Sequence, residues 1–145
     1  MLRYRVIPII LLDGCGVVKS TKFKNHRYIG DVINTVKIFN EKEVDELIIL
    51  GIIGSIKNQR PNFNLISDIA SECFMPLGYG GGLRDIDDIK TVLGLGCEKA
   101  IINTAAVLDP KFVEKAVNIF GGQSIVVSID VKKVGLLNKY TAFIK

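Results

Sequence analysis

The chain has 145 residues, of which 48% are hydrophobic and 23% are charged, with a formal net charge of +4. This balance is typical of one folded globular domain and excludes a disordered or collagen-like chain. No apolar run approaches the roughly 20 residues of a membrane span, and the N-terminal residues lack a signal-peptide pattern, so we expect a cytoplasmic protein without membrane contact. The basic residues are scattered, which argues against nucleic-acid binding.

The cysteines and the histidine give no sign of a metal site. Cys15, Cys73 and Cys97 are odd in number and widely spaced, so they fit neither a disulfide framework nor a zinc site, and we interpret Cys73 and Cys97 as packing residues. His26 lies in a polar segment without companions at ligand spacing. The sequence therefore predicts no metal, and nothing in it implies an organic cofactor.

Short apolar runs alternate with amphipathic segments along the whole chain. The runs are continuous rather than alternating, as in parallel strands covered on both faces, and they predict strands at residues 6–12, 47–53, 76–79, 100–102 and 124–129. Between the strands, apolar residues at i, i+3 and i+4 predict helices over residues 32–39, 65–73, 86–93 and 112–120.

Capping residues agree with the predicted helix ends. Asp85 can cap the third helix, and Gly96 can end it in the left-handed conformation. Asp109 followed by Pro110 is typical of an N-cap with proline in the first turn. These signals support the helix pattern independently of its apolar periodicity.

The repeated strand–helix order predicts an α/β fold with a parallel sheet, either an open doubly wound sheet or a (β/α)8 TIM barrel. The chain holds about four and a half βα units, whereas a barrel takes roughly 250 residues. We therefore expect one partial domain over residues 1–145, made of βα units one to four and a fifth strand. Residues 134–145 add a strand-like segment with no fifth helix.

Two explanations fit this length: a fragment of a longer chain, which we favour, or a shortened gene product. An open half-barrel exposes a strand edge and an apolar interior. If the chain exists alone, we expect it to self-associate through that edge.

Two segments at predicted strand ends suit anion binding. Gly81 and Gly82 follow the third strand and precede a helix, where glycines let backbone N–H groups approach a phosphate. Asn103 and Thr104 follow the fourth strand, and small hydroxyl-bearing residues there also suit a phosphate. The alternatives are a tight turn for the glycines and a helix cap for Asn103.

Two ionisable residues stand at the same predicted end of the sheet. Asp130 closes the fifth strand, where a carboxylate can serve as an acid or base, or can cap a loop. Lys19 is expected in the loop after the first strand, either in a site or as a solvated lysine.

Six segments in order carry a family likeness: residues 2–8, 16–19, 45–47, 80–82, 103–107 and 120–130. Together they resemble the cyclase subunit of imidazole glycerol phosphate synthase, a lyase of histidine biosynthesis. The resemblance implies a (β/α)8 barrel that receives ammonia from a separate glutaminase subunit. It also implies that ammonia crosses the barrel to a phosphorylated small-molecule substrate at the carboxyl ends of the strands.

The resemblance also assigns residues. It implies that Gly82, Asn103 and Thr104 bind a substrate phosphate beside Gly81. Asp130 would be one of two acid–base carboxylates, and Lys19 would belong to a mobile loop over the site. Glu98 would dock the glutaminase, and the ammonia entrance would be gated by Arg5, Glu46 and Lys99. Because these three residues stand at predicted strand starts, a purely structural ion-pair ring explains them equally well.

The sequence departs from the family pattern at two strand ends. Leu11 stands where the family has its other catalytic aspartate, and Gly51 stands where an aspartate usually ends the second strand. Asp13, two residues after Leu11, would be displaced by roughly 6–7 Å and is a poor replacement. These losses favour a related branch associated with amidation of bacterial surface sugars. A histidine-pathway cyclase and a non-catalytic glutaminase-binding module remain alternatives.

Overall fold

The computed structural model describes residues 4–21, 23–53, 59–135 and 139–144. Its main sheet has seven strands in the order β3-β2-β1-β4-β5-β6-β7. Five of them are parallel: β1 (Ile9–Asp13), β4 (Leu47–Gly51), β5 (Leu77–Gly80), β6 (Lys99–Ile102) and β7 (Ile125–Val127). These five follow one another across the sheet in chain order, without the reversal of a doubly wound sheet. The prediction of a barrel-type α/β fold is therefore confirmed for this part of the wall.

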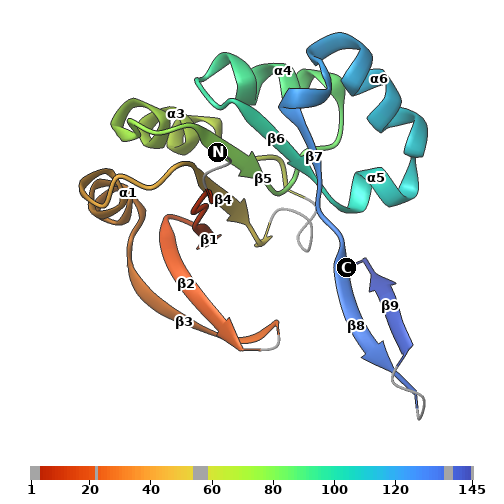
Figure 1. The fold of residues 1–145 in the computed structure, drawn as a ribbon, viewed down its shortest axis with the longest axis horizontal. Coiled ribbons are helices and arrows are strands. Elements are labelled where there is room, and N and C mark those ends of the chain that lie inside the picture. Colours follow the sequence, from red (N-terminus) through yellow and green to blue (C-terminus); the bar gives the residue numbers. More distant parts are fainter. Residues whose placement is uncertain (1–3, 22, 54–58, 136–138, 145) are drawn as a thin grey trace.

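Helices cover one side of the curved sheet (Figure 1). They are α1 (Val32–Glu41), α3 (Phe63–Glu72), α4 (Ile86–Gly94), α5 (Thr104–Leu108) and α6 (Pro110–Phe120), followed by the 3-10 turn η1 (Gly122–Ser124). The four predicted helices correspond to α1, α3, α4 and α6. The short α5 was not predicted, because five residues are too few to show a helical period. None of the described helices is long and apolar enough to cross a bilayer.

The predicted caps are confirmed. The Asp85 carboxylate accepts a hydrogen bond from the Asp88 amide at 2.8 Å, and Asp109 accepts one from the Lys111 amide at 3.1 Å. Gly96 follows α4 with φ of +111°, a conformation that glycine adopts readily.

The core lies between the sheet and its helices. Apolar residues of the strands pack there against α1, α3, α4 and α6, with Leu47, Ile49, Ile66 and Ile89 almost completely buried. The opposite side of the first strand is open, since Ile9 is 60% exposed. Two covered faces, which the continuous apolar run suggested, are not seen for this strand, whereas the exposed apolar interior expected of an open half-barrel is.

The segment after β1 differs from the prediction. Lys19 was expected in a loop, but it lies within β2 (Gly16–Thr21), which pairs antiparallel with both β1 and β3 (Lys24–Asp31). Gly14, with φ of +61°, allows the tight turn that folds β2 back on β1. The β-branched Val17 and Val18 then favour an extended strand.

The end of the chain also differs from the prediction. Asp130 does not close β7, which ends at Val127, but begins β8 (Asp130–Val134). This strand pairs antiparallel with β9 (Lys139–Phe143), and the hairpin is separate from the main sheet (Figure 1). The strand-like tail is thus confirmed, with a partner that the sequence did not reveal.

A substitution in the glycine turn after β5 can test how tightly the strand ends pack. Gly81 has φ of +112°, and a Cβ there would lie 2.1 Å from the Gly51 carbonyl oxygen. We predict that Gly81→Ala destabilises the protein by about 3 kcal/mol, because strain and a backbone clash add. Urea denaturation measures the loss.

Gly94→Ala is the matched control. A Cβ there has nothing within 4 Å, and the residue lies in α4. Alanine should therefore leave stability unchanged or raise it by up to about 1 kcal/mol. Equal effects of the two substitutions would contradict the role given to the Gly81–Gly51 contact.

Candidate functional site

A pocket of about 170 Å³ opens at the carboxyl ends of the parallel strands. In a barrel this is the end at which active sites are built. Its lining includes five residues singled out from the sequence: Gly81, Gly82, Asn103, Thr104 and Asp130. Leu11 of β1, the β2–β3 hairpin and the ends of β4 and β6 contribute further lining residues.

Asp130 and Asn103 form the polar centre of this pocket. The Asn103 side-chain amide donates a hydrogen bond to the Asp130 carboxylate at 2.9 Å. Asn103 stands at the N-cap position of α5, but its side chain makes no capping hydrogen bond. The Asn103 side-chain amide therefore holds the Asp130 carboxylate and does not cap the helix.

The glycine turn forms another wall. Gly81 and Gly82 have φ of +112° and +73°, and a Cβ on Gly82 would lie 2.8 Å from the Gln59 carbonyl oxygen. The turn interpretation is correct for the backbone. Because both glycines also line the pocket, a tight turn and a bare backbone surface for a ligand occur together.

Leu11 lines the pocket at the place where a family carboxylate was expected. Asp13 lies instead on the lining of a different cavity, beside Gly14 and Arg60. It follows that Leu11 gives one wall of the pocket an apolar character and that Asp13 does not restore the charge.

Gly51, the second departure, accommodates a neighbouring side chain. A Cβ on Gly51 would lie 2.8 Å from the hydroxyl oxygen of Tyr79. Tyr79 is 5% exposed, and burial, with the nearby Cys97 thiol adding to it, raises the pKa of Tyr79 to about 12. An aspartate at position 51 would displace this neutral buried phenol.

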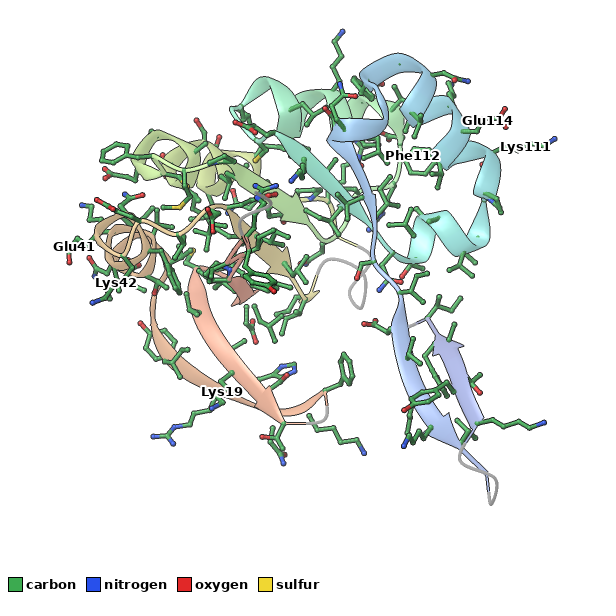
Figure 2. All side chains as sticks on the ribbon, viewed as in Figure 1. Lys19, Glu41, Lys42, Lys111, Phe112 and Glu114 are labelled. Carbon is green, nitrogen blue, oxygen red and sulfur yellow. The ribbon has the colours of Figure 1, made fainter. Side chains whose placement is uncertain are left out.

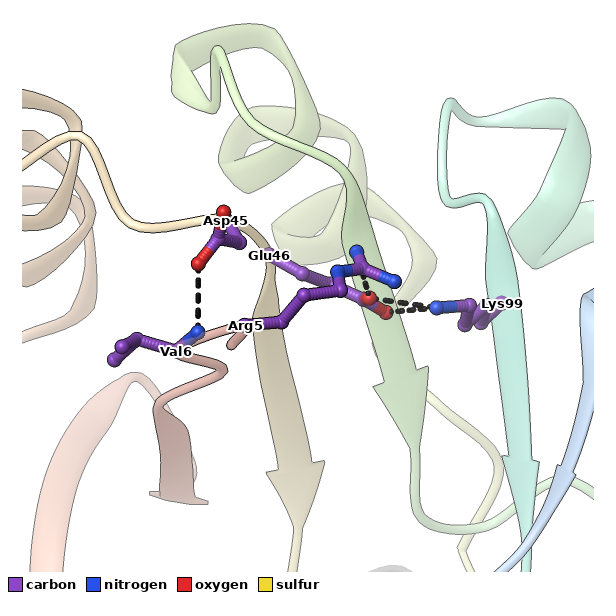
Figure 3. A network of polar contacts seen from close by, with 5 residues as sticks. All are labelled: Arg5, Val6, Asp45, Glu46 and Lys99. Carbon is purple, nitrogen blue, oxygen red and sulfur yellow. Dashed lines mark hydrogen bonds and ion pairs between the residues drawn. The ribbon is translucent and has the colours of Figure 1, made fainter. Parts of the chain in front are cut away.

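Three charged residues meet at the opposite end of the strands (Figure 3). Glu46 is 1% exposed, and its carboxylate accepts hydrogen bonds from Arg5 at 3.0 Å and from Lys99 at 2.6 Å. Beside it, the Asp45 carboxylate accepts a hydrogen bond from the Val6 amide at 2.6 Å. The three predicted gate residues therefore form one network at the amino ends of β4 and β6.

Glu98 precedes Lys99 and is exposed, and its backbone amide donates to the Leu77 carbonyl oxygen at 2.8 Å. Its carboxylate is thus available to a partner beside the charged network. A docking role stays a prediction.

Lys19 does not join the pocket. It is exposed on β2, and Figure 2 shows it on the hairpin, which extends away from the helices. The pocket is lined instead by Ser20, Phe23 and His26 of the same hairpin. The sequence reasoning missed these three residues because it treated the segment as a loop; the alternation of a strand would have placed Ser20 opposite to Lys19.

A family profile for histidine biosynthesis proteins matches residues 5–144. A Pseudomonas aeruginosa protein is 51% identical over 133 residues, which are 92% of this chain and 53% of the relative. A Leptospira borgpetersenii protein is 47% identical over 144 residues, 99% of this chain and 57% of the relative. Both are provisionally named as imidazole glycerol phosphate synthase subunits.

A Campylobacter jejuni protein with the same provisional name is 49% identical over 135 residues, 93% of this chain and 54% of the relative. The chain spans about half the length of the curated relatives that it matches. The resemblance inferred from the sequence is confirmed by these matches.

The charged network makes a prediction about stability. Glu46→Ala should destabilise the protein by about 3 kcal/mol, because it removes the buried carboxylate between two cations and leaves Lys99, 25% exposed, without its partner. Chemical denaturation of the variant measures the change.

Glu72→Ala is the control, since Glu72 pairs with Lys37 at 3.6 Å and the two side chains are 42% and 54% exposed. We expect a loss below about 1 kcal/mol for this surface pair. A Glu46→Ala loss no larger than that would show that the network contributes little to the fold.

Proposed function

Because the chain belongs to the histidine biosynthesis protein family, we propose that it is the ammonia-accepting barrel part of a synthase that works with a separate glutaminase subunit. The observation that carries this proposal is the polarity of the sheet. A charged network lies at the amino ends of the strands, and a pocket with a held carboxylate lies at their carboxyl ends.

In this proposal ammonia arrives at the amino ends of the strands. Arg5, Glu46 and Lys99 surround the entrance, and Glu98 beside them offers a carboxylate to the glutaminase. Since the glutaminase must deliver a small neutral molecule, a tightly paired charged ring serves to admit ammonia and to exclude ions. The proposed site is thus divided between the two ends of one sheet. We place the protein in the cytoplasm.

At the other end we place a phosphorylated acceptor. Gly81, Gly82 and Thr104 line the pocket with bare backbone and a hydroxyl, which suit a phosphate. The ammonia nitrogen adds to an electron-poor double bond of the acceptor, whose π electron pair moves to the far atom, and Asp130 takes the proton that the nitrogen loses. Asn103 orients the carboxylate for that step. Lys19 enters this scheme only if the β2–β3 hairpin moves over the bound acceptor.

The identity of the acceptor is the second question. Leu11 leaves one pocket wall apolar where cyclisation would use a second carboxylate, so we favour an acceptor other than the histidine-pathway substrate. Amidation in bacterial surface-sugar biosynthesis fits a barrel that receives ammonia but lacks the carboxylate pair. The histidine-pathway cyclase is the alternative.

An ammonia-dependent cyclase assay on the full-length gene product tests the acceptor. We predict no cyclase turnover for the natural protein and measurable turnover for Leu11→Asp. Adding Asp130→Asn to Leu11→Asp should lower that turnover roughly 100-fold or more, because the proton acceptor is lost. Turnover by the natural protein would instead support the histidine-pathway cyclase.

Stimulation of the partner glutaminase separates the enzyme from a binding module. Asp130→Asn lies at the far end of the strands from Glu98, so it should leave the stimulation intact while Glu98→Lys weakens it. A protein that stimulates glutaminase yet aminates no acceptor would be a non-catalytic module.

The open side of the sheet leads to a prediction about assembly. Ile9, Val127 and Ile129 are each more than two-fifths exposed, and β7 is an edge strand among the described residues. We propose that the 145-residue chain on its own self-associates through this edge. Sedimentation velocity at micromolar concentration should show dimers or larger species, whereas a purely monomeric profile would contradict the proposal.

A further inference from the structure

The pocket at the carboxyl ends of the strands has an unusual charge balance. Among its described lining residues, only Asp130 and His26 have ionisable side chains. A phosphate monoester carries about −1.5 to −2 charges near neutral pH. Beside the Asp130 carboxylate, such a ligand needs a cation to offset the repulsion, and in this lining only His26 can provide one.

The backbone explains why His26 lies there. In the β2–β3 ladder Lys19 pairs with Arg27 and Thr21 pairs with Lys24, so Ser20 stands opposite two residues, Asn25 and His26. This is a β-bulge, and bulges re-aim side chains next to functional sites. Asn25 has φ of +54°, so the distortion is concentrated immediately before His26.

The basic neighbours of His26 lie elsewhere. Lys19 on β2 and Lys24 and Arg27 on β3 add positive charge to the hairpin, but none of them lines the pocket. On the other side of the pocket the ionisable group is Asp130, at the start of β8. Among the described residues of the hairpin, His26 is thus the one basic side chain that lines the pocket, while Lys19, Lys24 and Arg27 lie outside the lining.

We propose that His26, in its imidazolium form, is an anion ligand of this pocket and holds the phosphate of the acceptor against the Gly81–Gly82 turn and Thr104. The inference rests on the proposed function in one respect, namely that the pocket takes a phosphorylated ligand. Binding then depends on pH: a ligand that prefers the charged imidazole binds more tightly at low pH and loses that advantage as the imidazole gives up its proton.

Anion binding by the protein at two pH values tests this. Inorganic sulfate is the probe, because its charge is constant over the range in which phosphate titrates; inorganic phosphate repeats the measurement at low pH. We expect the natural protein to bind sulfate about tenfold more tightly at roughly pH 5.5 than at roughly pH 8, because a protonated imidazole attracts the anion and a neutral one does not.

Two hairpin variants make the result specific. His26→Gln should bind sulfate weakly and equally at both pH values. Lys19→Gln removes a cation from the same hairpin outside the pocket lining, and it should keep the full pH dependence. The C–H proton signals of His26, the one histidine of the chain, should also shift on adding sulfate.

The outcomes are distinguishable. If the natural protein binds neither sulfate nor phosphate, the phosphate site of the proposed function fails together with this inference. If it binds anions with the same affinity at both pH values, or if His26→Gln keeps the pH dependence, the role of His26 is overturned while the anion site stands.

Discussion

A buried carboxylate joins three distant parts of the chain. Glu46, which immediately precedes β4, is bonded to Arg5 near the N-terminus and to Lys99 at the start of β6. Taking a carboxylate out of water is costly, and two cations at hydrogen-bond distance offset that cost only when all three groups are in place. The network therefore fixes the relative positions of the strand starts, and through the parallel register it fixes the strand ends as well.

The two ends of the sheet are held together in different ways. At the amino ends, charges are paired closely: the Arg5 side chain donates to Glu46, and the Val6 backbone exchanges hydrogen bonds with Asp45. At the carboxyl ends, close packing is achieved by leaving side chains out: Gly51 leaves room for Tyr79, and Gly81 leaves room for the Gly51 carbonyl. Because these glycines have no side chains, their backbone is also exposed to the pocket. A closely paired charged network and a bare-walled pocket thus follow from the packing of the same strands.

The sequence predicted the elements whose signals are local. The stripes of α1, α3, α4 and α6, and the caps at Asp85 and Asp109, depend on neighbours within one or two turns. The Arg5–Glu46–Lys99 network could be anticipated only because parallel strands start at one edge. The Asn103–Asp130 hydrogen bond joins residues 27 apart and depends on where β7 ends, which no local pattern specifies.

The β2–β3 hairpin was the main element that sequence reasoning misplaced. Its polar residues are typical of a loop, and its strand character depends on pairing with β1. When the segment is interpreted as a loop, Lys19 is the residue that is expected at the site. Treated as a bulged hairpin, the segment turns Ser20 and His26 to the pocket and leaves Lys19 outside.

Leu11 and His26 give the pocket a consistent chemical character. Leucine in place of a carboxylate on strand one lowers the negative charge around a ligand, and the proposed imidazolium form of His26 would lower it further. In the proposed function, both features favour an anionic acceptor held beside Asp130 as the single base over a reaction that needs two carboxylates. Acid–base chemistry shared between two carboxylates requires both within hydrogen-bond reach of the reacting atoms. One carboxylate held by Asn103 and an apolar wall at Leu11 therefore support the proposed addition of ammonia to a phosphorylated acceptor over the alternative of ring closure.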